Sequence, residues 1–75
     1  MNEPNLNVME NAILMAWDYL DRSGELGEPE MAARVLLDVV QGMIRGGEQR
    51  PLMLSNRAID AYKRFRSERH LALVS

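Results

Sequence analysis

The residues best suited to acid–base chemistry form two close carboxylate pairs, Asp18 with Asp21 and Glu28 with Glu30. A general acid or base needs a desolvated cleft that shifts its pKa. Both pairs fall where exposed helix or turn positions are expected, so a solvated surface is the favoured interpretation. The one histidine, His70, lies near the C-terminal end and has no evident Ser, Cys or Asp partner, which favours a surface role. No catalytic residue is predicted.

Metal and cofactor chemistry has little support in the residue types present. The chain has no Cys and a single His, which excludes disulfides, thiolate metal sites and multi-histidine zinc sites. The pair Gly46 and Gly47 is not followed by the Lys and Ser or Thr of a phosphate-binding loop, so it is interpreted as a helix stop. We therefore expect no metal, no cofactor and no enzymatic activity.

Basic side chains gather in the last third of the chain, where a helix could present them to phosphates. On the face expected to be exposed, Asp60 and Glu68 offset most of that charge. A helix-turn-helix motif also needs a link of about three or four residues, and the link predicted from Gly46 to Leu54 is longer. A small dimeric DNA-binding regulator is thus the alternative function. Its candidate contact residues are Arg57, Lys63, Arg64, Arg66 and Arg69.

The elements that would position these residues are helices. Asn7 with Glu10 three residues later resembles a capping box, Pro29 suits the first position of a second helix, and Ser55 is a good N-cap for a third. The connection before Ser55 is apolar enough to fold over the end of a bundle. An N-terminal arm and an apolar C-terminal tail complete the single domain, residues 1–75. The predicted helices span about residues 7–22, 29–45 and 55–69.

The second predicted helix is unusually apolar. At roughly 100° per residue its polar side chains fall in a strip only roughly 80° wide, which leaves an apolar arc of roughly 240°. An ordinary surface helix has an apolar stripe of ~100°, so this helix is expected to be central and covered on most sides. The five residues of the polar strip are Glu30, Arg34, Asp38, Gln41 and Arg45.

A chain of 75 residues has few elements to cover such a helix, and a single core of this size is marginal. An isologous dimer is the simplest closed solution. We therefore expect an all-α three-helix unit completed by a second copy, with a heterologous protein as the other possible occupant of the apolar surface. The expected interface residues are Leu14, Val35, Val39, Gly42 and Met43.

Charge is divided unevenly along the chain. Residues 1–38 carry eight acidic and two basic side chains, a net charge of −6, whereas residues 39–75 carry three acidic and seven basic ones, a net charge of +4. The two halves could attract each other within one chain or across a dimer. No basic leader and no apolar run near the roughly 20 residues of a membrane span is visible, so a cytoplasmic location is expected. The expected function is a small non-enzymatic protein-interaction or regulatory module.

Overall fold

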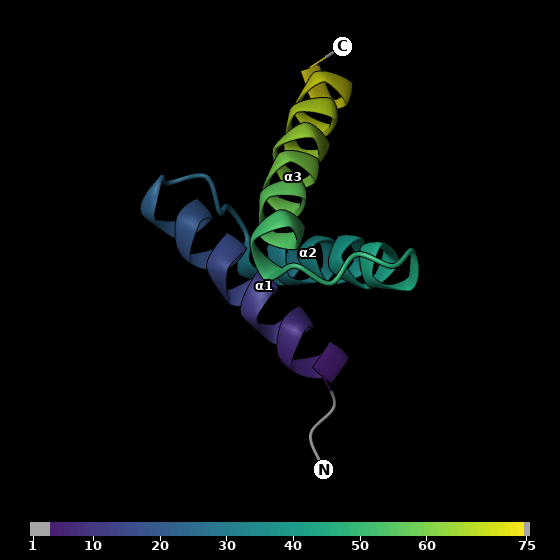
Figure 1. Ribbon diagram of the computed structural model, residues 1–75. Helices are drawn as coiled ribbons and strands as arrows, with labels where there is room; N and C mark the ends of the chain where they lie inside the picture. Colours follow the sequence, from purple (N-terminus) through teal and green to yellow (C-terminus); the bar gives the residue numbers. More distant parts are fainter. Residues whose placement is uncertain (1–3, 75) are drawn as a thin grey trace.

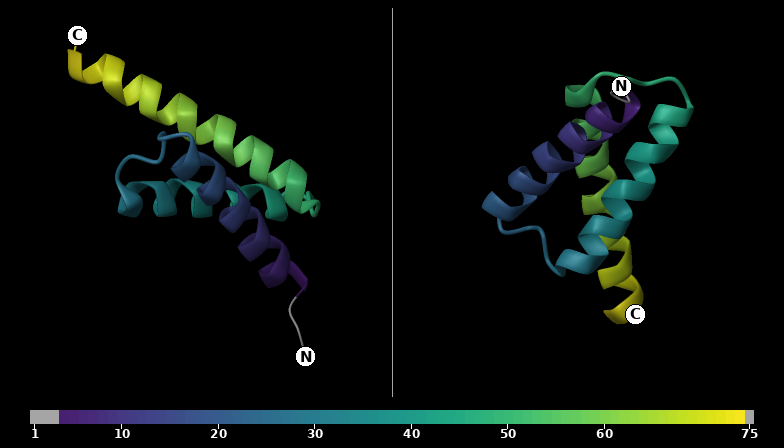
Figure 2. Two further views of the ribbon diagram at one scale, coloured as in Figure 1. Left: turned by 90° about the vertical axis from the view of Figure 1, so that its left-hand side faces the viewer. Right: turned by 90° about the horizontal axis from the view of Figure 1, so that it is seen from below.

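The computed structural model describes residues 4–74 as three helices, α1 (Pro4–Arg22), α2 (Pro29–Arg45) and α3 (Pro51–Val74). Each helix packs against both others, which confirms the all-α three-helix architecture. Helices α1 and α2 diverge from each other, and α3 lies across the pair (Figure 1). Two further views show that α3 is the longest element and that its C-terminal turns extend away from α1 and α2 (Figure 2).

All three prolines of the chain stand at the first residue of a helix. This position tolerates proline because its N–H has no partner within the helix and its fixed φ suits the first turn. Pro29 begins α2 as predicted. Pro4 and Pro51 begin α1 and α3 several residues earlier than expected, so the predicted arm and the predicted connection are both shorter.

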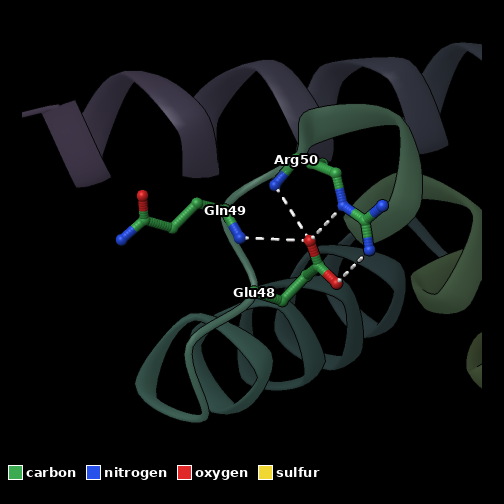
Figure 3. A network of polar contacts seen from close by, with 3 residues as sticks. All are labelled: Glu48, Gln49 and Arg50. Carbon is green, nitrogen blue, oxygen red and sulfur yellow. Dashed lines mark hydrogen bonds and ion pairs between the residues drawn. The ribbon is translucent and has the colours of Figure 1, made fainter.

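The start of α3 is the clearest departure from expectation. Ser55, the predicted N-cap, lies inside the helix and is only 3% exposed. In the short link before α3, Oε2 of Glu48 accepts hydrogen bonds from the backbone N–H groups of Gln49 and Arg50, each at 3.1 Å, so the link folds back around this carboxylate (Figure 3). The apolar residues after Pro51 therefore belong to the first turn of α3 rather than to a connection.

An ion pair between Glu48 and Arg50 reinforces the folded link. The Arg50 guanidinium donates Nε to Oε2 of Glu48 at 3.0 Å and Nη2 to Oε1 at 3.1 Å. These side-chain bonds, followed by the backbone N–H of Arg50, lower the pKa of Glu48 from 4.5 to about 2. The carboxylate is therefore held in its charged form by the folded link.

The core is built from three stripes of the same spacing, i, i+4 and i+8. Every stripe contains at least one Ala, which lets the backbones approach closely, and the loop adds Leu26. Interdigitation of i±4 ridges crosses helices at about 50°, in agreement with the splayed arrangement in Figure 2. The stripes are Ala12, Ala16 and Leu20 in α1; Ala32, Leu36 and Val40 in α2; and Leu54, Ala58 and Tyr62 in α3.

The wide apolar arc of α2 is largely covered within the chain. Because α2 has a neighbouring helix on each side, both flanks of its buried stripe are half-buried: Val35, Val39, Met43 and Ile44 pack against the core. In α2 it is chiefly Leu37 that stays exposed. α2 buries about as many side chains as α1 or α3 in the described residues, so burial is shared evenly. No helix in the described part of the chain is both long and apolar enough to cross a membrane.

The hydrogen bonds that Glu48 accepts within the link predict a pH dependence of stability. Its folded pKa lies below the ordinary value, so the stabilisation is complete above pH 4.5 and is lost as the pH falls towards 2. Glu48→Gln should lower the free energy of unfolding near pH 7, and the difference from wild type should vanish near pH 2. Urea titrations at several pH values measure this difference. A difference that stays constant with pH would contradict the role of the Glu48 charge.

Candidate interaction surface

The C-terminal part of α3, residues 67–74, forms an arm that extends away from α1 and α2 (Figure 2). Between Arg66 and Leu73 every residue is exposed. Two large apolar side chains on the arm, Leu71 and Leu73, are 60% and 75% exposed. The predicted apolar tail is therefore helical and presents its leucines to solvent.

A shallow groove of about 250 Å³ runs between the base of this arm and the start of α2. Pockets for small molecules usually occupy roughly 300–1,000 Å³, so this groove is better suited to a protruding side chain than to an enclosed ligand. The α2 side consists of Gly27, Glu28 and Met31. The α3 side consists of Tyr62, Phe65, Arg66, Arg69, His70 and Leu73.

The α3 wall of the groove is basic, with Arg66, Arg69 and His70 at its rim. Arg69 is exposed, and its Nη1 lies 3.8 Å from the sulfur of Met31. The N-terminal end of α2 adds partial positive charge from the helix dipole, and its N-cap residue, Glu28, makes no side-chain capping hydrogen bond. Glu28 is the carboxylate among the lining residues, so the groove combines an apolar floor with a mostly positive rim.

The loop that forms one end of the groove is fastened to α3 by two long-range hydrogen bonds. The buried hydroxyl of Tyr62 donates to the carbonyl of Leu26, and the guanidinium of Arg66 donates to the carbonyl of Glu25. Gly27 has a φ of +68°, and a Cβ there would lie 3.1 Å from Cζ of Arg66. The loop therefore needs glycine both for its conformation and for the close approach of Arg66.

The five predicted nucleic-acid contacts lie on different sides of α3. Arg57 and Arg64 line a separate depression with Asp60. Lys63 faces α1, where its Nζ lies 5.3 Å from the Tyr19 ring centroid and 3.6 Å from Glu25 Oε1. Its hydrogen bond to Tyr19, aided by the Glu25 charge, raises the pKa of Lys63. With Arg66 and Arg69 at the groove, the five cations do not share one face.

The five predicted interface residues also divide into groups. Val35, Val39 and Met43 are half-buried against the core of their own chain. Gly42 is exposed, and a Cβ there would meet nothing within 4 Å, so no element of this chain uses the close approach that glycine permits. Leu14 is 61% exposed. At roughly 100° per residue it lies nearly opposite the buried stripe of α1, so the five do not form one surface.

The groove was not among the predicted sites, because its walls come from segments more than thirty residues apart. The sequence signal was the apolar pair Leu71 and Leu73 directly after a basic stretch. Their spacing of two does not distinguish an extended tail from a helix. The continuation of α3 as a helix places Leu73 in the same groove as the loop and the start of α2.

Comparisons with known proteins give no indication of function. No protein-family model, curated protein or solved structure matches this chain. The proposed function therefore depends on the arm, the groove and their charges.

Removal of the Tyr62 hydroxyl should weaken the fold. Tyr62→Phe leaves the Leu26 carbonyl without its buried donor, and an unsatisfied buried acceptor costs about 1–3 kcal/mol. Tyr19→Phe is the matched control, because Tyr19 is 47% exposed and water can replace its hydrogen bond to Lys63, so stability should change by less than about 0.5 kcal/mol. Chemical denaturation at one low protein concentration compares the two variants. Equal effects of both would show that the loop is not held by this bond.

Proposed function

We propose that this chain is a small protein-interaction module that self-associates through the α3 arm and the groove at its base. The observation that carries the proposal is the exposure of Leu71 and Leu73 on the arm, where Leu73 lines the groove together with Met31 and Phe65. Exposed apolar side chains rimmed by polar residues are typical of protein-binding surfaces. The proposed role is binding, and regulation through binding, rather than catalysis.

Self-association is favoured over a purely monomeric role by the size of the chain and by its charge. A small domain has a marginal core, and a second copy adds buried apolar area without a longer sequence. The two halves of the chain also carry opposite net charges, so the acidic half of one copy can attract the basic half of a second copy. We do not propose DNA binding, because the cations that would contact DNA lie on different sides of α3.

The arm leucines offer a direct test. Leu71→Gln with Leu73→Gln should raise the dimer dissociation constant at least about tenfold, since each buried Leu is worth about 1.5–3 kcal/mol and each substitution occurs twice in a dimer. Gln is nearly as good a helix former as Leu, so the helix content should be unchanged. Light scattering on a sizing column over a range of concentrations measures the molar mass.

Leu52→Gln provides the matched control for this experiment. Leu52 is 62% exposed at the other end of the same helix, so its substitution should leave the molar mass as in wild type. A wild-type chain that remains monomeric at every concentration would refute self-association. A double variant that dimerises as wild type does would refute the role of the arm.

A further inference from the structure

A second exposed surface has the opposite character to the groove. On the outer side of α1, Leu14 is 61% exposed, with Glu10 and Asp18 one turn away on either side and Asp21 one turn beyond Asp18. All three carboxylates are exposed. We call Glu10, Leu14, Asp18 and Asp21 the acidic strip. It presents one apolar side chain among negative charges.

The groove presents the reverse arrangement. Its floor includes Met31 and Phe65, and its rim carries Arg66, Arg69 and His70. Its volume of about 250 Å³ accommodates a side chain of the size of Leu. Strip and groove are therefore complementary in charge: the strip has a leucine among three carboxylates, whereas the cations Arg66 and Arg69 outnumber the one carboxylate of the groove, Glu28.

We propose that the groove of one chain receives the acidic strip of a second copy, with Leu14 as the side chain that enters it. This proposal rests on the proposed function and specifies how self-association occurs. The strip cannot reach the groove of its own chain, because Leu14 points away from the buried stripe through which α1 packs on α2 and α3. The contact therefore requires another molecule.

Each chain carries one strip and one groove, so a two-fold arrangement makes the same contact twice and closes as a dimer. Breaking the ion pair that the strip forms within its own helix costs little free energy. Asp18 forms an ion pair with Arg22 at 3.1 Å, and the side chains are 61% and 80% exposed, respectively. Exposed pairs of this kind contribute little to stability, which leaves the Asp18 carboxylate available to the basic rim.

Charge reversal at the rim is the decisive experiment. Arg69→Glu is preferred to a change at Arg66, because Arg66 also holds the loop. Arg69→Glu should raise the dimer dissociation constant at least about tenfold, since each exposed charge contact is modest and is reversed at two symmetric sites. Arg57→Glu changes the net charge equally at the separate depression on α3 and should change the constant by less than about threefold.

The compensating substitution completes the cycle. Asp18→Lys alone should weaken the dimer, and Asp18→Lys combined with Arg69→Glu should restore the dissociation constant to within about threefold of wild type. The affinity of the wild-type dimer should also fall as salt rises from about 0.05 M to about 0.5 M, because exposed charges are screened. Analytical ultracentrifugation measures each constant, and circular dichroism checks that every variant is folded.

The outcomes separate this proposal from the more general one. A wild-type dimer that is weakened by the arm variant but equally insensitive to Arg69→Glu and Arg57→Glu overturns the strip-and-groove contact and leaves self-association through the arm intact. Failure of the combined variant to recover also overturns the contact. A wild-type chain that is monomeric throughout overturns both proposals and leaves the groove to a different protein.

Discussion

The hydrogen bond from Tyr62 to the carbonyl of Leu26 is the constraint on which the surface of this protein depends. It joins residues 36 positions apart and lies in the buried core, where an unpaired carbonyl would be costly. By fixing the loop between α1 and α2 against the middle of α3, it places Gly27 and Glu28 opposite Arg66. The groove is thus a by-product of how the loop is anchored, and the buried hydrogen bond holds the wall that the loop forms.

The core explains how so short a chain forms three mutually packed helices. Each helix contributes one narrow stripe at four-residue spacing, and the small Ala residues within the stripes let the helices approach closely around the larger Leu, Val and Tyr side chains. The flanks of α2 are then covered by its two neighbours, which accounts for most of the apolar arc that the periodicity revealed. The apolar surface that remains is concentrated on the arm, on Leu14 and at a few isolated positions.

Patterns among neighbouring residues predicted those features of the fold that depend on residues close together in the sequence. The number of helices and the bounds of α2 follow from periodicity, from Pro29 and from the glycines after Arg45. The beginning of α3 did not follow, because Ser55 and Pro51 both suit a helix start and the helix begins at Pro51. The groove could not be predicted, since it requires knowing that the loop meets α3, a contact that no local pattern specifies. The five expected interface residues lie on different parts of α1 and α2, and their role as an interface stays a prediction.

The arm has one further consequence. The exposed last turns of α3 depend largely on their own backbone hydrogen bonds, and short isolated helices are marginal in water. The last turns of α3 therefore open and close on their own, at a free energy far below that of global unfolding. Their amide hydrogens should exchange with solvent faster than those of the buried stripes. Any partner that covers Leu71 and Leu73 must first suppress this motion. The helix propensity of the arm therefore sets part of the binding affinity, even through residues that do not contact the partner.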